Sequence, residues 1–139
     1  MDPITDKDQF IAEVKGGITP YLDIEGAVKA ADFYVRAFGA TIAAAVPPDE
    51  TGRTMHVHLY LNGGSLMLSD PYPEYAPGGT GKPRGFNLTL QVDDIEAVFG
   101  RAVAEGCTVV MPVETMFWGA RYGQVRDPFG VLWAFNQHI

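Results

Sequence analysis

Hydrophobic and polar residues alternate along this chain in short runs typical of β-strands, and two stretches between them have helical spacing. Apolar side chains recur every three or four positions over residues 26–38 and from Asp93 to Gly106, which predicts two helices. Asp93 is the expected cap of the second helix, with Glu96 three positions later. The expected strands cover residues 18–24, 41–46, 54–61, 65–69, 86–92, 108–113, 120–125 and 131–135.

The order strand, helix, strand, strand, strand occurs twice. Residues 18–24 match 86–92 at an offset of 68, which aligns Thr19 with Asn87. Residues 54–69 match 121–136 at an offset of 67, which aligns Met67 with Ala134. A single βαβββ unit cannot bury both faces of its sheet, so we expect two tandem βαβββ modules. The predicted fold is α+β, a half-open barrel with a central cleft.

The modules have flanking segments of different composition. Residues 1–17 predict an N-terminal helical arm that begins at Thr5 and ends at Gly16-Gly17. Residues 18–70 form the first module and 85–139 the second, within a single domain of residues 1–139. The linker loop over 71–84 is rich in proline and glycine, and its glycine run resembles a phosphate-binding loop, but no helix pattern follows it.

The last hairpin is the most specific local signal. Asp127-Pro128-Phe129-Gly130 has the residues of a tight turn, and strand-like runs flank it. Trp133 and Phe135 alternate with Ala134, so they are expected in the core beneath the helices if Ala134 points into the cleft.

Bulk properties exclude several classes of function. The 139-residue chain has a net charge of −7, which argues against nucleic acid or an anionic membrane as a partner. No apolar run approaches the roughly 20 residues of a membrane span. The one cysteine, Cys107, excludes an internal disulfide and lies in an apolar run, so a buried structural role is expected. These features favour a cytoplasmic location.

Three stretches resemble a known superfamily: residues 31–40, residues 55–70 with their SLMLSD run, and residues 117–130 with FWG, RYG and DPFG. They are similar to the vicinal oxygen chelate superfamily of glyoxalase I, bleomycin-resistance proteins and extradiol dioxygenases, and most of all to its PhnB-like branch. The resemblance covers residues 18–137. It implies the fold directly, whereas function depends on the site.

Enzymes of that superfamily hold a divalent metal with four side chains, one early on the first strand and one on the last strand of each module. The resemblance places these positions at Thr19, Met67, Asn87 and Ala134. Methionine and alanine supply no hard oxygen or imidazole nitrogen, so no metal and no other cofactor is expected there.

His56 and His58 are the best ligand-like pair, because residues two apart on a strand face the same side. Two interpretations stay open. The pair binds a metal with a distant third ligand such as Glu114, or it contacts an organic ligand or a structural hydrogen-bond partner.

Glu114, Arg121 and Tyr122 flank Phe117-Trp118 near the last hairpin. They either orient a polar ligand at the mouth of the cleft or form a surface salt bridge. No catalytic residue is assigned, since no nucleophile lies with a base and an orienting group. The expected ligand-binding residues are Thr19, Tyr21, His56, His58, Met67, Asn87, Phe117, Trp118, Arg121 and Tyr122.

Three hypotheses for function follow. The first is a metal-free, bleomycin-resistance-like protein that binds a small aromatic or amphipathic molecule in the cleft and forms a homodimer, as the resemblance implies. The second is a lyase, isomerase or dioxygenase with a non-standard metal site at His56 and His58. The third is an interaction module with a closed cleft. Whether the chain is an enzyme is left open.

Overall fold

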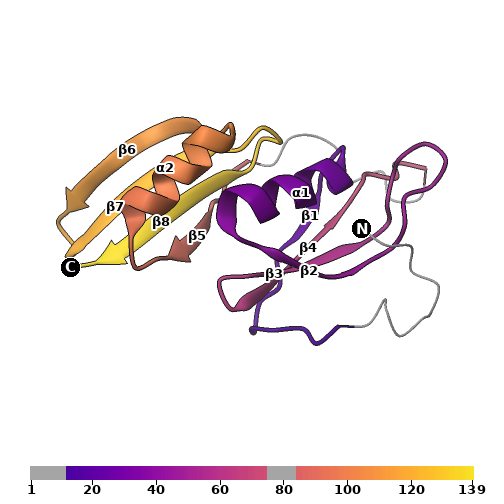
Figure 1. Cartoon of the computed structure of the whole chain (residues 1–139), viewed down its shortest axis with the longest axis horizontal. Coiled ribbons are helices and arrows are strands. Elements are labelled where there is room, and N and C mark those ends of the chain that lie inside the picture. Colours follow the sequence, from indigo (N-terminus) through magenta and orange to yellow (C-terminus); the bar gives the residue numbers. More distant parts are fainter. Residues whose placement is uncertain (1–11, 75–83) are drawn as a thin grey trace. The chain divides into compact units, whose positions relative to one another are not determined.

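The computed structural model describes residues 12–74 and 84–139. The chain divides into two compact units, residues 1–81 and 82–139, which contain the first and second modules (Figure 1). Each unit holds one helix and one four-stranded sheet, which confirms the α+β class and the two tandem βαβββ modules. No helix in the described ranges is long and apolar enough to cross a membrane.

In the first module the strand order is β1-β4-β3-β2, and only the β1–β4 pair is parallel. The helix α1 lies against one face of this sheet through buried alanines, Phe33 and Tyr34. The strands contribute Val57, Leu59 and their neighbours to the same core. The elements are β1 Tyr21–Asp23, α1 Ala27–Phe38, β2 Thr41–Ala45, β3 Val57–Leu61 and β4 Gly64–Ser69.

The second module repeats this arrangement with the strand order β5-β8-β7-β6. Trp133 and Phe135 of β8 are buried, and the Phe99 ring of α2 meets Phe135 edge to face, so the prediction that both aromatics lie in the core is confirmed. The elements are β5 Leu88–Gln91, α2 Ile95–Glu105, β6 Thr108–Met116, β7 Ala120–Arg126 and β8 Leu132–His138.

Strand pairing confirms the internal repeat. Tyr21 pairs with Met67 in the parallel β1–β4 ladder, and Thr89 pairs with Ala134 in the parallel β5–β8 ladder. Thr89 thus matches Tyr21 at the predicted offset of 68, and Ala134 matches Met67 at the predicted offset of 67. The third strands differ from the prediction. His58 pairs with Met67, whereas Gln124 pairs with Ala134, so β3 matches β7 at an offset of 66. The turn between β7 and β8 is one residue longer than the Asn62-Gly63 turn between β3 and β4, which explains the shift.

In each module a side chain at the carboxyl end of the last strand caps the helix: Asp70 directly follows β4, and Gln137 is the penultimate residue of β8. Asp70 Oδ1 accepts hydrogen bonds from the backbone N–H of Gly26 at 2.8 Å and of Ala27 at 3.4 Å. Gln137 Oε1 accepts from the N–H of Ile95 at 2.8 Å, at the equivalent place in α2. These bonds give acceptors to backbone N–H groups at the start of each helix, so they join the helix to the last strand in both modules.

The prediction that Asp93 caps the second helix is wrong by one residue. Asp94 is the N-cap of α2, and its side chain accepts from the N–H of Ala97 at 3.2 Å. Two consecutive aspartates can each serve as a cap, and the sheet pairing that ends β5 at Gln91 decides between them.

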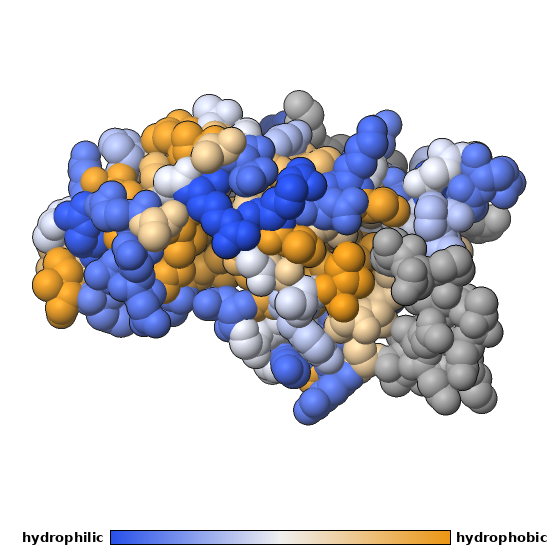
Figure 2. All heavy atoms as spheres, viewed as in Figure 1, coloured by the Kyte–Doolittle hydropathy of each residue, from blue (hydrophilic) through white to orange (hydrophobic). Residues whose placement is uncertain are grey.

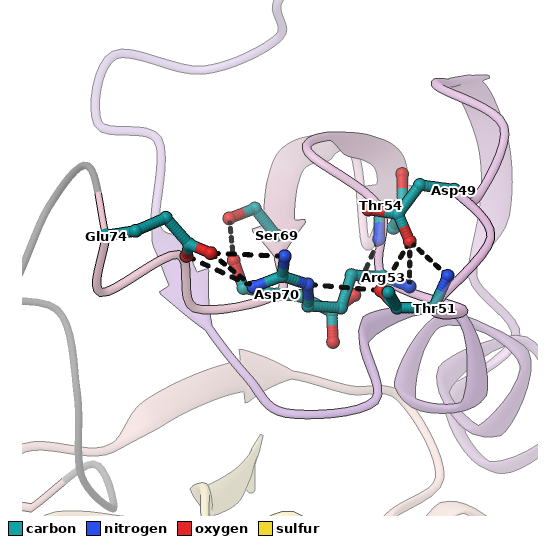
Figure 3. Close-up of polar contacts among 7 residues, drawn as sticks. All are labelled: Asp49, Thr51, Arg53, Thr54, Ser69, Asp70 and Glu74. Carbon is teal, nitrogen blue, oxygen red and sulfur yellow. Dashed lines mark hydrogen bonds and ion pairs between the residues drawn. The ribbon is translucent and has the colours of Figure 1, made fainter.

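In the first module a polar loop precedes β3 (Figure 3). Asp49 Oδ1 accepts from the N–H of Thr51 and of Arg53, and Arg53 forms an ion pair with Glu74 at 3.1 Å. The Asp70 carboxylate, besides its role at the helix, accepts from the N–H of Thr54 at 2.8 Å. This loop shortens the third strand, which was expected from residue 54 and begins at Val57.

The expected N-terminal helix is wrong over its last turn, because residues 12–15 are not helical. The rest of that helix, and residues 75–83 of the linker with its glycine run, lie outside the described residues. The strand β6 is longer than expected and forms the outer edge of its sheet, with Val109 and Val110 both exposed. Figure 2 shows hydrophobic and hydrophilic residues interspersed over the second module in this view.

Candidate functional site

Each sheet has one face covered by its helix and a second face that the helix does not cover, which we call the helix-free face. Side chains alternate between the two faces along a strand, so strand register assigns each residue. In the first module Tyr21, Met67, His58 and Ala44 lie in one cross-strand row of the helix-free face. In the second module the equivalent row is Thr89, Ala134, Gln124 and Met111.

The helix-free face of the first module carries four rings in succession. Tyr21 and His56 have ring centroids 5.8 Å apart, His56 and His58 6.5 Å, and His58 and Tyr60 5.1 Å. The Tyr21 hydroxyl lies 3.0 Å from His56 Nδ1, and His58 Nε2 lies 2.7 Å from Ser65 Oγ. The predicted residues Tyr21, His56, His58 and Met67 are therefore brought together on this face.

Burial sets the protonation of the two imidazoles. His58 is only 2% exposed, and its pKa is lowered by burial first and by the neighbouring His56 second. Burial also lowers the pKa of His56. Both rings are thus neutral at pH 7, and this face offers imidazole nitrogens without their positive charge. Tyr21 stays a neutral phenol, because burial and the Asp23 carboxylate raise its pKa.

The N-terminal arm contacts one end of this face. The Lys15 N–H donates to Ser65 Oγ at 2.8 Å, and the Tyr60 hydroxyl donates to the Glu13 carbonyl at 2.7 Å. The Lys15 ammonium lies 4.2 Å from the centre of the Tyr60 ring. The arm segment at residues 13–15 therefore covers the Tyr60–Ser65 end of the face and leaves Tyr21, at the other end, half exposed.

The helix-free face of the second module carries a hydrogen-bonded group of amides and aromatics. Trp118 Nε1 donates to Asn136 Oδ1 at 3.2 Å, and Asn136 Nδ2 donates to Gln91 Oε1 at 2.9 Å. Gln124 Nε2 donates to the Tyr122 hydroxyl at 2.9 Å. The rings of Trp118 and Tyr122 meet edge to face, with centroids 5.4 Å apart. This hydrogen-bonded group contains no histidine, and His138, which shares the face by register at the end of β8, is exposed.

The β6–β7 turn places two aromatics beside that group. Gly119, with a φ of 81°, closes the turn by donating its N–H to the Met116 carbonyl. Trp118 folds back toward β8 and keeps 45% of its surface exposed, while Phe117 is 96% exposed and meets the Trp118 ring edge to face. Of the two predicted aromatics, Trp118 belongs to the face and Phe117 lies at its rim.

Arg121 and Tyr122 do not share a face. Arg121 pairs with Thr115 and forms an ion pair with Glu96 of α2, on the helix side. Tyr122 pairs with Glu114 on the helix-free face. The structure therefore shows the salt bridge that was one of the two alternatives, with Glu96 in place of Glu114 as the acid.

Thr19 and Asn87 both precede the first strand of their module rather than lying within it. Thr19 is half-buried, and Asn87 is exposed and accepts from the Thr89 hydroxyl at 2.6 Å. Met67 and Ala134, which the resemblance gives as the last-strand positions, are equivalent in the two parallel ladders.

This set of four residues does not fit a divalent metal. Alanine has no donor atom, a thioether is a soft ligand, and the remaining hydroxyl and amide are weak donors without a carboxylate or imidazole. Within residues 12–74 and 84–139, no group of three His, Cys, Asp or Glu side chains is placed to hold a metal ion.

Sequence reasoning missed several residues of the two faces. Tyr60 and Ser65 were not assigned, although a period of two indicates Tyr60 from His58 and Ser65 from Met67. Gln124 was missed because the assumed offset of 67 put β7 out of register by one residue. Gln91 and Asn136 were not assigned, although they lie two positions beyond Thr89 and Ala134 on strands whose offsets were right. Cys107 is buried as expected, and burial raises the pKa of its thiol to about 12, so it is unreactive at neutral pH.

A family model described as Glyoxalase/Bleomycin resistance protein/Dioxygenase superfamily matches residues 26–135. The chain belongs to this superfamily. It is 38% identical over 138 residues to uncharacterized protein Rv0887c of Mycobacterium tuberculosis (strain ATCC 25618 / H37Rv), covering 95% of this chain and 80% of that protein. The resemblance drawn from the sequence is confirmed.

Solved structures of the superfamily agree with the fold. The PhnB protein from Bacillus cereus, titled a putative 3-demethylubiquinone-9 3-methyltransferase, has a TM-score of 0.69 at 26% identity, covering 88% of this chain and 99% of that one. TnmS3, an antibiotic binding protein from Streptomyces sp. CB03234, has a TM-score of 0.64 at 30% identity, covering 93% and 98%. The predicted similarity to the PhnB-like branch is therefore confirmed.

Proposed function

We propose that this superfamily member binds a small aromatic or amphipathic molecule on its helix-free faces, without a metal. One observation carries the proposal. The face of the first module sets four rings, Tyr21, His56, His58 and Tyr60, in contact with one another, with the Met67 side chain in the same cross-strand row. Rings and a thioether give apolar contact area, and the neutral imidazoles and hydroxyls give directional hydrogen bonds.

Three findings support binding rather than metal chemistry. The four positions where superfamily enzymes hold their metal carry Thr19, Met67, Asn87 and Ala134 here, and these residues do not fit the ion. The equivalent face of the second module also combines aromatics with uncharged polar groups. One structural relative, TnmS3, is titled an antibiotic binding protein. The cleft between the modules stays a prediction from the sequence.

A thermal-shift screen with small neutral aromatic compounds tests the proposal, run with and without a chelator. We expect compounds that raise the melting temperature equally in both conditions. His58→Gln gives the first module the residue that the second module has at the equivalent position, Gln124. It should weaken the binding of compounds on the face of the first module. Stabilisation that disappears with the chelator would contradict the proposal.

The second candidate is the metal-dependent lyase, isomerase or dioxygenase built on His56 and His58. It is favoured by one observation, since both imidazoles are neutral and lie on the same face, and neutral imidazole is the form that binds metal. Metal content that is lost in a His56→Ala, His58→Ala double variant discriminates it from metal-free binding.

We also propose that the chain forms a homodimer. Support comes from β6, an outer strand of its sheet that exposes Val109 and Val110 and has an unpaired backbone edge within the described residues. Light scattering across a concentration series tests this proposal. A mass of one chain at every concentration would contradict it.

A further inference from the structure

The hydrogen bonds on the helix-free face of the second module have a fixed direction at one end. The Trp118 indole nitrogen can only donate, so Asn136 Oδ1 must be the acceptor. The amide nitrogen of Asn136 is then the group that donates to Gln91 Oε1. This branch is internally satisfied, and it holds the Trp118 ring in place against β8.

The second branch has unused hydrogen-bonding capacity. Gln124 Nε2 donates to the Tyr122 oxygen at 2.9 Å. No other described residue bonds the Tyr122 hydroxyl proton or Gln124 Oε1, so a donor and an acceptor lie side by side. If the Gln124 amide is turned over, Tyr122 donates to it, and the pair still presents one acceptor and one donor.

Aromatic surface adjoins this pair. The Trp118 ring meets Tyr122 edge to face and is 45% exposed, so it can stack on a flat molecule. Glu114 is the residue paired with Tyr122 across the β6–β7 ladder, and its carboxylate disfavours an anion at this place. The exposed Trp118 ring, the Tyr122–Gln124 pair and the Glu114 carboxylate together favour a flat, uncharged ligand with hydrogen-bonding groups.

We propose that this face, made by Trp118, Tyr122 and Gln124, binds a flat uncharged aromatic molecule whose edge carries an acceptor beside a donor, as in a cyclic lactam. The inference rests on the proposed binding function and adds the site and the ligand class. The ligand carbonyl accepts from one member of the Tyr122–Gln124 pair, and the ligand N–H donates to the other. The ring stacks on Trp118.

The probe is quinolin-2(1H)-one, which has the carbonyl next to an N–H, and the comparison compound is 1-methylquinolin-2-one, which lacks the N–H. Binding is followed on the two indole N–H signals of the ¹⁵N-labelled protein. Trp133 is an internal control, because it is buried and its indole nitrogen donates to Asp127 at 2.9 Å. Variants are Tyr122→Phe and Gln124→Leu, with Glu96→Gln on the helix side as the matched control.

We expect quinolin-2-one to shift the Trp118 signal, leave Trp133 unmoved and bind about tenfold more tightly than the methylated compound, since a missing donor leaves a site acceptor unpaired. Tyr122→Phe and Gln124→Leu should each reduce this preference to about twofold or less, and Glu96→Gln should keep it. The inference is overturned if the two compounds bind with equal affinity or if quinolin-2-one does not bind. It is also overturned if both Tyr122→Phe and Gln124→Leu keep the preference for quinolin-2-one. The screen with a chelator judges the broader binding function separately, since it includes aromatic compounds of other classes.

Discussion

The two modules have the same framework and different helix-free faces. Tyr21 pairs with Met67 as Thr89 pairs with Ala134, and a side chain at the carboxyl end of the last strand caps the helix in both modules. Yet His58 of the first face stands where Gln124 stands in the second. The comparison teaches that backbone pairing and helix caps fix the fold, while the face is free to change its chemistry. Four predictions test it, from the largest effect to the smallest.

Removing the helix caps should show that the first module depends more on its cap than the second. Asp70 is buried and accepts from Gly26, Ala27 and Thr54, so Asp70→Ala leaves three N–H groups without their acceptor. We expect a loss of about 3 kcal/mol in the free energy of unfolding. Gln137→Ala removes one neutral acceptor and should cost about 1 kcal/mol. Urea unfolding followed by circular dichroism measures both, and equal losses would contradict the comparison.

The helix–sheet contact is also made differently in the two modules. A Cβ at Gly123 would lie 2.9 Å from Phe99 Cε2, whereas the matching residue in β3 is Val57 and α1 meets its sheet with alanines. Gly123→Ala should therefore destabilise the second module by about 2 kcal/mol through overpacking.

The matched control for that change is Gly100→Ala in α2, next to Phe99, where a Cβ meets nothing within 4 Å. It should stabilise by about 0.5 to 1 kcal/mol, because alanine has the higher helix propensity. Both tryptophans lie in the second module, so fluorescence during urea unfolding reports on it directly. A stabilising Gly123→Ala would show that Phe99 moves aside freely.

Acid should destabilise the first module more than the second, whose one histidine, His138, is exposed at the end of β8. Burial lowers the pKa of His58 and His56, so the unfolded chain binds protons at a higher pH than the folded chain. Stability is therefore full above about pH 6.5 and falls as the pH drops toward the folded pKa values, by at most about 1.4 kcal/mol per pH unit for each histidine.

Hydrogen exchange of the β3 and β4 amides between pH 7.5 and pH 5.5, corrected for the intrinsic pH dependence of exchange, measures this effect. His58→Gln should weaken the pH dependence, since it replaces the titrating ring by the residue of the second module. If His58→Gln left the pH dependence of exchange unchanged, titrating groups other than His58 would cause that dependence.

The smallest effect is expected at the ion pair between Arg121 and Glu96. Both side chains are partly exposed, so solvent screens the pair. Arg121→Ala should lower the free energy of unfolding by less than about 1 kcal/mol. A loss of several kcal/mol in urea unfolding would show that Arg121 has a packing role against α2.

The fold could be predicted because it depends on periodic signals that repeat. The helix-stopping Gly39 and Gly106 and the strands around Met67 and Ala134 gave the modules and their offsets. The cap at Asp94 and the start of β3 could not be predicted, because sheet pairing and the hydrogen bonds of the Asp49 loop decide them.

The candidate site was predicted in part for a similar reason. Tyr21, His56, His58 and Met67 come together because their strand register was assigned correctly. Gln124 was missed because one extra turn residue shifts β7, and a shift of one residue exchanges the two faces of a strand.

The central claim is that the helix-free faces bind an organic molecule and no metal. Elemental analysis of protein purified without a chelator, and then offered Zn²⁺, Mn²⁺, Ni²⁺ and Fe²⁺ in turn, tests it most directly. The account predicts far less than one metal ion per chain in every case, with the same content in the His56→Ala, His58→Ala double variant. One metal ion per chain that the double variant loses would contradict the account.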